Sequence, residues 1–384
     1  MHIPFVDLKA QYRAHQSEID AAIAAVIGET AFIRGKYVAA FEQSYAEKYG
    51  VKHCVSCGNG TDAIFITLKM LGIGAGDEVI TTSNSWIASS ETITLTGARV
   101  VFVDVEDDCY DLDATKIEAA ITPRTKAILP VHLLGQPAQM DVIMDIARRH
   151  GLPVVEDCAQ AHFATFGGRR VGTFGLAGTF SFYPGKNLGA YGDAGAIIPD
   201  DDGLAEKVRM FANHGADRVN KHEHLLEGVC SRLDGLQAAI LSAKLPHLDA
   251  WTLARQERAA KYDELLGGVA EIITPKVRAG AMHVYHNYVL RAQQRDALQT
   301  FLKENGIETT RHYPVPLPFL KAYAYLGHTP ADFPIVAKHS REIISLPVYP
   351  ELTAVQQVWV AERIREFYAR KQAARPAQSP AASA

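Results

Sequence analysis

The sequence has no long hydrophobic run and no excess of charge of either sign. Its 384 residues include no stretch of about 18 apolar residues, the length that a membrane-spanning helix needs. The start, "MHIPFVDLKAQYRAHQSEID", has neither a charged beginning nor an apolar centre, so we expect no signal peptide and a cytoplasmic protein. A formal net charge of -4 provides no basic surface for nucleic acid or an anionic membrane. We therefore expect small molecules and further copies of the chain as partners.

The sequence is also poor in cysteine, with five residues, an odd number that favours reduced thiols over a disulfide framework. Cys54 and Cys57 form a C-x-x-C pair, but a zinc site would need a second pair, and Cys109, Cys158 and Cys230 are scattered singly. We therefore predict structural thiols and no metal site.

What the sequence does contain, from about residue 51 to 200, is an alternation of short β-rich runs with helical segments. Such alternation is typical of a mostly parallel sheet covered by helices. Several of the runs are continuously apolar, as expected for strands with both faces buried. The runs are "HCVSC", "EVITTS", "VVFVDV", "KAILPVHLLG", "LPVVEDCAQ", "GTFSFYP" and "AGAIIPD". Ligands of such sheets bind at the carboxyl ends of the strands, so the functional residues should follow them.

Outside this region the sequence favours helices. Upstream, "SEIDAAIAAVIGE" places Ile19, Ile23, Val26 and Ile27 on one stripe, which predicts a helical arm packed on another surface. After residue 200, the long segment 233–268 should be interrupted at Pro246. A smaller unit with a strand at "HNYVLRA" and two further helices follows, and the tail "AARPAQSPAASA" has a disordered composition.

The segment "CGNGTDAIFITL" predicts a binding site for an anion. A strand ends before the glycines and a helix begins at about Thr61, so free backbone N–H groups face the edge of the sheet. Gly58, Gly60 and Ala63 also match the spacing of dinucleotide-binding turns. The acid expected after the next strand is missing, because Asp77 precedes that strand. A turn without a ligand remains an alternative for this segment alone.

Two further strand ends carry groups that can do chemistry. Glu156 and Asp157 are adjacent in "LPVVEDCAQAH" and point to opposite faces, so only one of them can enter a site at the sheet's edge. A solvated loop acid is the alternative interpretation. The next motif, "SFYPGKNLGAYGDAGAI", surrounds Lys186 with glycines.

Lys186 does not belong to a nucleoside-triphosphate loop, because Phe180 and Asn187 occupy the places where that motif needs Gly and Ser or Thr. A lysine in a glycine-rich turn is most often solvated. Here it is accompanied by a phosphate-binding helix start and by an acid at a neighbouring strand end. Pyridoxal 5'-phosphate (PLP) requires these three groups for its phosphate, its ring nitrogen and its aldehyde.

With these motifs, the sequence resembles the DegT-type nucleotide-sugar aminotransferases, PLP enzymes with the aspartate aminotransferase fold. The combination of E-D-x-A-Q with S-F-x-P-x-K-x-L-G-x-x-G-D is specific to them. The resemblance covers nearly the whole chain and rests on "FVDLKAQYRAHQSEID", "GNGTDAI", "VFVDV", "VVEDCAQAH", "FSFYPGKNLGAYGDAGAI", "SRLDGLQAAIL" and "ISLPVYPEL".

The resemblance implies an α/β protein of the three-layer fold type I. It predicts a large PLP-binding domain over residues 1–250, including the arm, and a smaller α+β domain over 251–370, followed by the tail 371–384. It further implies that Lys186 forms the Schiff base with PLP and that Asp157 pairs with the pyridine nitrogen. Homodimers with shared active sites are the family's usual assembly.

Further cofactor contacts follow from the same resemblance. Gln160 would lie beside the ring hydroxyl, and Trp86 matches the aromatic position that stacks on the ring. Ser181 and the backbone of Gly60 and Thr61 would hold the phosphate.

The chain departs from the family at two positions. Cys230 in "GVCSRLD" replaces an asparagine that is thought to reach the partner's cofactor phosphate, and Pro318 in "PVPLPFL" replaces a histidine. Both changes bear on affinity and substrate choice. Our candidates for contacts with the substrate are His132, Arg232, Arg311, His312 and Tyr313.

The implied reaction is a transamination in two halves, from glutamate as donor to a keto sugar as acceptor, with Lys186 as the proton carrier. Whether the sugar is aminated at C3 or C4, and which nucleotide it carries, stays open. The alternatives are a sugar dehydratase, in which a histidine replaces the lysine, a nicotinamide-dependent dehydrogenase, and a catalytically inactive regulator on the same fold. Lys186 argues against the dehydratase, and a dehydrogenase leaves Asp157 and Lys186 without a role.

Overall fold

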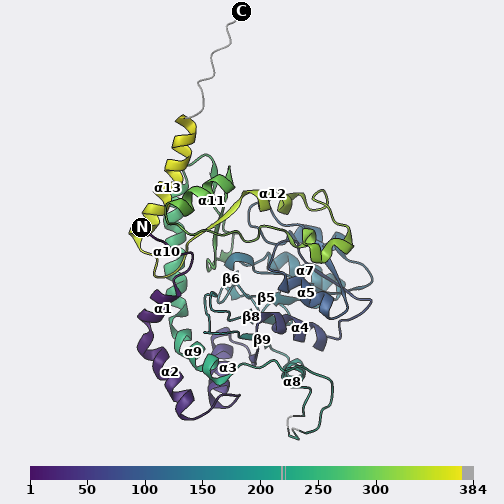
Figure 1. Cartoon of the computed structure of the whole chain (residues 1–384). Helices are drawn as coiled ribbons and strands as arrows, with labels where there is room; N and C mark the ends of the chain where they lie inside the picture. Colours follow the sequence, from purple (N-terminus) through teal and green to yellow (C-terminus); the bar gives the residue numbers. More distant parts are fainter. Residues whose placement is uncertain (218, 221, 374–384) are drawn as a thin grey trace, which may run out of the picture.

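The centre of the molecule is a sheet, and most of its strands have their carboxyl ends at one edge, where the candidate site lies. The computed structural model describes residues 1–217, 219–220 and 222–373. Four strands lie in the order β1-β9-β8-β5, of which β9, β8 and β5 are labelled in Figure 1, and three more lie in the order β3-β2-β4. Parallel bridges from Ile128 to Val154 and from Val131 to Asp157 join β4 to β5 and make the two sets continuous. The strands are β1 (Val55–Cys57), β2 (Glu78–Thr82), β3 (Arg99–Val103), β4 (Thr125–Leu129), β5 (Val155–Asp157), β8 (Ala177–Ser181) and β9 (Gly195–Pro199).

The sheet is mostly parallel, as the sequence predicts. β2 pairs in parallel with β3 and β4, and β5 pairs in parallel with β8, whereas β9 runs antiparallel to both β8 and β1. The carboxyl ends of β1, β2, β4, β5 and β8 therefore meet at one edge. Residues after those ends are close together although they lie far apart in the sequence.

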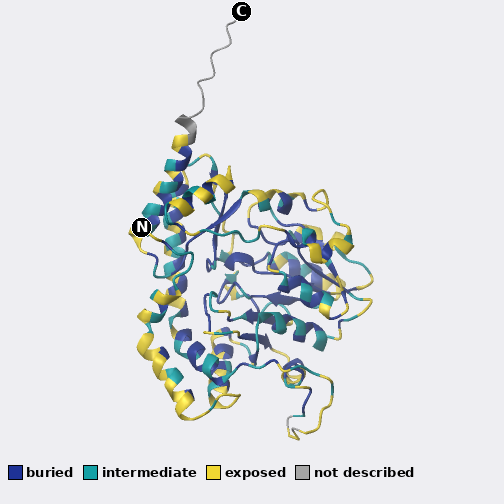
Figure 2. Ribbon diagram, in the orientation of Figure 1, coloured by how far each residue is buried: buried dark blue, intermediate teal, exposed yellow. Residues whose placement is uncertain are grey.

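Helices cover both faces of the sheet, which makes three layers. Neighbouring strand residues enter opposite cores: Val79 packs against α4 and α5, whereas Ile80 packs against α7. Phe41 and Tyr45 of α3 form a further core with Phe180 and the helix α9. Figure 2 shows the strands buried between these helices. The covering helices are α3 (Lys36–Tyr49), α4 (Gly60–Met70), α5 (Ala88–Leu95), α6 (Ile117–Ala120), α7 (Met140–His150), α8 (Asp202–Phe211) and α9 (Gly235–Lys244).

The N-terminal arm consists of α1 (Leu8–Ala14) and α2 (Gln16–Gly28), and α2 lies along α9 (Figure 1). Ile19 and Val26 are fully buried, as the helical stripe predicts, but Ile27 is 54% exposed. Pro246 interrupts the long helical segment as expected: the 3-10 turn η3 (Leu245–His247) separates α9 from α10 (Leu248–Leu266).

A second, smaller unit packs its own core around an antiparallel sheet with the order β10-β12-β13. Its strands are β10 (Ile272–Ile273), β12 (Tyr288–Ala292) and β13 (Ile343–Leu346), and its helices are α10, α11 (Arg295–Glu304) and α13 (Ala354–Ala373). A short sheet of β6 (Thr165–Phe166), β7 (Arg169–Arg170) and β11 (Ala281–Met282) links the two units.

The boundary expected at residue 250 falls inside α10, and the chain also returns to the larger unit. Residues of η4 (Leu317–Phe319), η5 (Lys321–Leu326) and α12 (Pro334–Glu342) pack on α4, α5 and β2. The division into domains at 250 therefore stays a prediction. Of the expected disordered tail, 371–373 close α13, and 374–384 lie outside the described residues.

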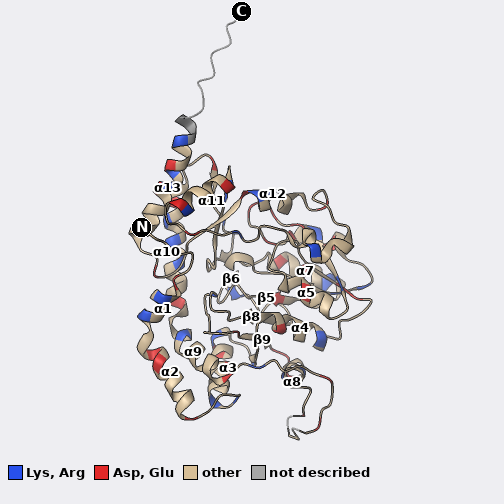
Figure 3. Cartoon of the chain, viewed as in Figure 1, with Lys and Arg blue, Asp and Glu red and all other residues tan. Residues whose placement is uncertain are grey.

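Lysine and arginine residues are interspersed with aspartate and glutamate residues along the chain (Figure 3). Among the described residues, no helix is both long and apolar enough to cross a lipid bilayer.

Candidate active site

Four of the predicted site residues lie at the edge where the parallel strands end. Asp157 is the last residue of β5, Ser181 is the last residue of β8, and Gly60 opens the helix that follows β1. Trp86 follows β2 by a few residues. The strand order therefore assembles groups that are separated by up to about a third of the sequence.

Gly60 and Ser181 form a close backbone contact that suits a phosphate. A Cβ atom added at Gly60 would lie only 2.6 Å from the Cβ of Ser181, so no other residue fits there without displacing a strand. The side chain of Asn59 accepts the N–H of Asp62 at 2.8 Å and caps α4. The N–H groups of Gly60 and Thr61 belong to the first turn and have no acceptor within the helix. Together with the Ser181 hydroxyl, they form a cradle for an anion at the positive end of the helix.

Asp157 is held rigidly at the same edge. Its side chain is 4% exposed. One carboxylate oxygen accepts the hydroxyl of Ser89 at 2.7 Å, and the other accepts the N–H of Ala159 at 3.1 Å. Ser89 is in turn within 2.8 Å of the hydroxyl of Ser85. These donors fix the direction of the carboxylate, as a partner for a protonated ring nitrogen requires.

Glu156 points to the opposite face, as the alternation of strand side chains predicts. It is fully buried and accepts the N–H groups of Gly172 and Gly175, each at 2.7 Å, and lies 3.0 Å from His132. The structure thus resolves which of the two adjacent acids enters the site, and assigns Glu156 to holding the loop 172–175 against β5.

Lys186 lies in the glycine-rich turn after β8 and keeps partial access to solvent. Desolvation by the surrounding protein lowers the pKa of Lys186 to about 8, although the nearby Asp157 carboxylate opposes that shift. Asn187 anchors the turn, because its amide donates to the carbonyl of Val284 at 3.0 Å. Roughly a tenth of such amines are neutral near pH 7, compared with very few for an ordinary lysine. Lys186 is therefore suited to bonding a carbonyl carbon or carrying a proton.

Gln160 and Tyr313 form one side of the site. The amide of Gln160 donates to the Tyr313 hydroxyl at 2.9 Å, and its carbonyl accepts the N–H of Leu134 at 2.7 Å. Each end of the amide retains one further hydrogen-bonding position for a ligand. Trp86 is 61% exposed, and its ring centroid lies 5.9 Å from that of Tyr313. The two aromatic rings thus provide a surface on which a flat ligand ring could stack.

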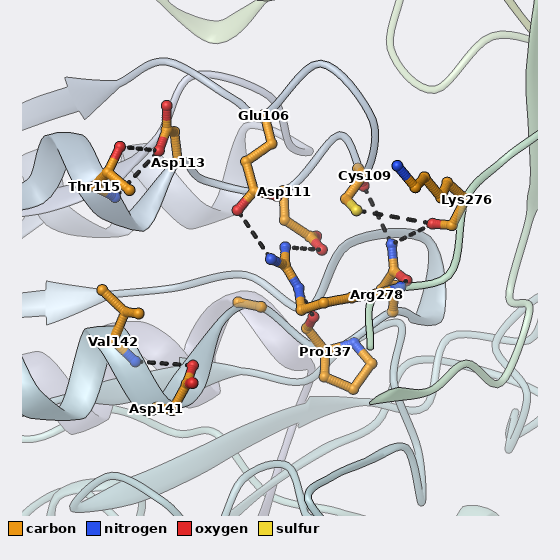
Figure 4. Close-up of polar contacts among 12 residues, drawn as sticks. Glu106, Cys109, Asp111, Asp113, Thr115, Pro137, Asp141, Val142, Lys276 and Arg278 are labelled. Carbon is orange, nitrogen blue, oxygen red and sulfur yellow. Dashed lines mark hydrogen bonds and ion pairs between the residues drawn. The ribbon is translucent and has the colours of Figure 1, made fainter. Parts of the chain in front are cut away.

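The loop that binds Gln160 is supported by the contacts of Arg278 with Glu106 and Asp111, which Figure 4 shows. Arg278 lies 3.0 Å from Glu106 and 3.6 Å from the fully buried Asp111. Asp111 also accepts the N–H of Leu133 at 3.2 Å, next to the Leu134 N–H that Gln160 binds. The position of Gln160 therefore depends on a loop that a distant arginine holds in place.

His312 joins Tyr313 near the lysine. Its ring nitrogen Nδ1 is within 2.8 Å of the Ser345 hydroxyl. Burial and, to a smaller degree, the charge of Lys186 lower the pKa of His312 to about 4, so the imidazole is neutral. His312 and Tyr313 are thus the two substrate candidates that the fold brings to the site.

The other three candidates lie elsewhere. His132 is fully buried, and both ring nitrogens have partners, Glu156 on one side and the N–H of Ala138 on the other. The guanidinium of Arg311 is bound by Gln299 and by Asp296 of α11. The ring nitrogens of His132 are therefore not available to a substrate within the chain, whereas Arg311 stays a prediction.

Arg232 lines a groove of about 790 Å³ between α3 and α8, together with Arg34 and Arg209. Cys230, two residues earlier, is exposed. Neither residue joins Lys186 within one chain. Pro318, at the other departure from the family, is buried in η4 and presents no polar group.

Two supporting residues were absent from the sequence prediction. Ser89 binds Asp157, and Lys244 of α9 donates to the carbonyl of Gly189 in the lysine's loop at 2.8 Å. Ser89 follows Trp86 by three residues, about one helical turn, and that spacing could have identified it. Nothing local distinguishes Lys244 from a surface lysine.

The chain matches the sequence profile of the DegT/DnrJ/EryC1/StrS aminotransferase family over residues 13–365. It is 47% identical over 370 residues to a pleiotropic regulatory protein of Geobacillus stearothermophilus, covering 96% of this chain and 99% of the relative. It is 42% identical over 365 residues to the dTDP-3-amino-3,4,6-trideoxy-alpha-D-glucose transaminase of Streptomyces venezuelae, covering 95% of this chain and 96% of that one. The crystal structure of S. venezuelae DesV in complex with a ketimine intermediate matches with a TM-score of 0.93 at 43% identity, covering 95% of this chain and 98% of that chain.

Proposed function

The chain belongs to the DegT/DnrJ/EryC1/StrS aminotransferase family, and we propose that it transfers the amino group of glutamate to a nucleotide-linked 3-keto sugar. The protein is a PLP-dependent aminotransferase of fold type I with small-molecule substrates. The observation that carries the proposal is the pair of Lys186, whose pKa is lowered to about 8, and the rigidly held Asp157 at the same sheet edge.

The site's residues fit PLP. The cradle of Gly60, Thr61 and Ser181 would hold the phosphate, because its close backbone approach excludes side chains and leaves N–H groups for an anion. Asp157 would keep the ring nitrogen protonated, and Trp86 would cover the ring. When bound, PLP supplies an aldehyde that bonds amines and a ring that withdraws electrons from the atom next to the bonded nitrogen.

Lys186 would serve as both base and acid. In the first half-reaction its neutral amine takes the proton from the α-carbon of the donor amino acid. In the second half-reaction it delivers a proton to the sugar carbon that gains the amine. Its lowered pKa supports both roles, because the neutral and protonated forms are then both accessible near neutral pH.

Amination at C3 is supported by the S. venezuelae relative, which is named as the transaminase of a dTDP-3-amino sugar. The neutral His312 and the Tyr313 hydroxyl at the mouth of the site would bind uncharged sugar hydroxyls. The nucleotide would lie farther out, where the solvent-accessible side of Trp86 continues the surface.

We further propose that the chain acts as a homodimer. Phe32, Ile33 and Leu225 are exposed on the described surface, and burial against a second copy would remove them from water. Two other features lie near these residues in the sequence. One is the groove that Arg232 lines, and the other is the exposed Cys230. Light scattering at micromolar concentration measures the mass of the assembly. The cytoplasmic location stays a prediction.

An absorption spectrum of the purified protein, followed by glutamate and then by keto sugars, tests the function. We expect a yellow protein that is bleached by glutamate and recovers its colour with a nucleotide-linked 3-keto sugar. The matched variant Lys186→Ala should neither attach the cofactor covalently nor complete the cycle. If the yellow colour returned only with 4-keto sugars, the proposed amination at C3 would be wrong. A wild-type protein that stays colourless when PLP is supplied would contradict the enzyme and favour a ligand-sensing regulator.

A further inference from the structure

Two histidines and a glutamate converge where the N-terminal arm meets the junction of α9 and α10. His15 lies between α1 and α2, Glu18 lies in the first turn of α2, and His247 closes η3. One ligand atom from each side chain lies within 4.8 Å of the others. Figure 1 shows α2 beside α9 at the left margin of the molecule, away from α4, α5 and α7. The convergence therefore depends on tertiary packing and joins two segments that are far apart in the sequence.

The geometry leaves the three side chains aimed at a common point that solvent can reach. His247 Nε2 lies 2.8 Å from Glu18 Oε2, and His15 Nδ1 lies 3.9 Å from Glu18 Oε1. The imidazole centroids are 4.1 Å apart. The side chains of His15 and His247 are 16% and 29% exposed, whereas that of Glu18 is 51% exposed. An ion with its remaining water molecules can approach from the side of the carboxylate.

A tryptophan behind the imidazoles fixes their orientation. Trp251 of α10 is buried, and its ring lies 5.3 Å from the His15 ring and 5.8 Å from the His247 ring. Rigid packing on an apolar wall reduces the conformational entropy that two histidines would lose on binding a common ligand. The Glu18 carboxylate contacts His247 but is half-exposed, so it can make the small movement that a metal ion would require.

We propose that His15, Glu18 and His247 form a binding site for a divalent transition-metal ion of the zinc type. Two imidazole nitrogens and one carboxylate oxygen are a donor set that zinc uses when water completes its coordination. Magnesium and calcium prefer oxygen ligands throughout, so this set discriminates against them. A bound ion would tie the arm to α10 and stabilise its position on the body.

The other convergent group among the described residues does not carry such a proposal. His132, Glu156 and Cys158 are all fully buried, and the histidine and the glutamate are already bound to each other and to backbone N–H groups. An ion would have to break these bonds and cross the protein core. At the site of His15 an ion would replace only the solvent-accessible contact of 2.8 Å between His247 and Glu18 and would not have to cross the core. This site uses none of the residues on which the proposed function rests.

Titration calorimetry of the full-length, PLP-loaded protein with zinc chloride, after removal of bound metal by a chelator, tests the proposal. We expect one equivalent of zinc per chain and a higher unfolding temperature with zinc. Loss of a residue that only supports a metal ligand typically weakens metal binding by about 10 to 100-fold. His15 and His247 would be direct ligands, so His15→Ala and His247→Ala should weaken zinc binding at least tenfold. His150→Ala is the matched control, because His150 contacts a surface glutamate at 2.9 Å and has no second histidine beside it.

Glu18→Gln keeps the test decisive if a histidine variant loosens the arm, because the exposed Glu18 side chain is replaced by one of equal shape. It too should weaken zinc binding, with the unfolding temperature of the metal-free protein unchanged. Cobalt(II) provides a second measurement, since its visible absorption reports nitrogen and oxygen ligation. A wild type that takes up no equivalent of zinc, or variants at all three positions that bind as the wild type does, would overturn the proposal.

Discussion

Lys186 and Lys244 meet at the same glycine-rich loop, and desolvation lowers the pKa of each to about 8. Their surroundings differ. Lys244 is 1% exposed, donates to the carbonyl of Gly189 at 2.8 Å and lies 4.2 Å over the ring of Tyr191. In the described part of the chain the Lys186 amine has no hydrogen-bond partner, and the Asp157 carboxylate lies near it. A lowered pKa therefore does not identify a reactive lysine; the partners of its amine do.

Lys186→Ala tests this distinction most strongly. Removing both the attachment point of the cofactor and the proton carrier should reduce turnover by at least about 10³-fold. The measurement is the rate of amino-sugar formation from glutamate and a keto sugar. The matched comparison is which lysine carries the cofactor, and borohydride reduction followed by peptide mass mapping identifies that lysine. Lys244→Met should still carry one trapped cofactor, at Lys186. A trapped cofactor at Lys244 in the Lys186→Ala protein would remove the difference between the two lysines.

Asp157→Asn tests the carboxylate of Asp157, which lies near Lys186 and has no counterpart in the contacts described for Lys244. The amide keeps the shape but loses the charge, and removal of one electrostatic partner typically costs about 10² to 10³ in kcat. Ser89→Ala is the graded control, because it removes one donor to the carboxylate and leaves the charge in place. Its loss should be roughly tenfold. Equal losses in the two variants would show that the position of the carboxylate matters and its charge does not.

The pH dependence of cofactor attachment tests the pKa of Lys186 directly. Only the neutral amine attacks an aldehyde, so the attachment rate of the cofactor-free protein should rise about tenfold per pH unit up to about pH 8 and then level off. Stopped-flow absorbance measures that rate. A rise that continues towards pH 10.5 would mean that Lys186 titrates as an ordinary lysine. Because the folded-state pKa lies below the unfolded value, the contribution of Lys186 to stability should also rise between about pH 8 and 10.5.

Lys244→Met should have the smallest effect. The variant relieves the desolvation of a buried ammonium but leaves the Gly189 carbonyl without its donor, so the free energy of unfolding should change by less than about 2 kcal/mol. Looser anchoring of the loop should slow turnover only a few-fold. Urea unfolding and steady-state kinetics at one pH measure both. The exposed Lys207 of α8 supplies the control variant Lys207→Met, which should change neither value. Complete loss of turnover in Lys244→Met would contradict a purely positioning role.

The strands of the large sheet were predictable because buried strands leave continuous apolar runs. The break at Pro246 was predictable for a similarly local reason, since proline lacks the N–H that a helix needs. The return of residues 317–342 to the larger unit was not predictable. Leu317 and Val336 carry the same apolar pattern whichever core they enter, and hydrophobic burial does not specify a partner.

The candidate site divides in the same way. Lys186, Asp157 and Gly60 could be singled out because each adjoins the carboxyl end of a strand, where a parallel sheet gathers its ligands, whereas Ser181 was implied only by the family resemblance. His132 follows a strand too, yet it faces the core and binds Glu156. Sequence position alone could not separate these cases, because the direction of a side chain after a strand depends on the turn that follows.

The sequence by itself determined the chemistry available to this protein: a lysine among glycines, an acid at the end of an apolar strand and a glycine before a helix. It could do so because strand ends and helix starts are set by local patterns of burial and by backbone freedom. Only the tertiary structure decided which donors hold Asp157 and Glu156 in opposite directions, and that the Lys186 amine, unlike that of Lys244, has no hydrogen-bond partner among the described residues. Those choices depend on which donors and acceptors, brought from distant segments, satisfy each polar group in the interior.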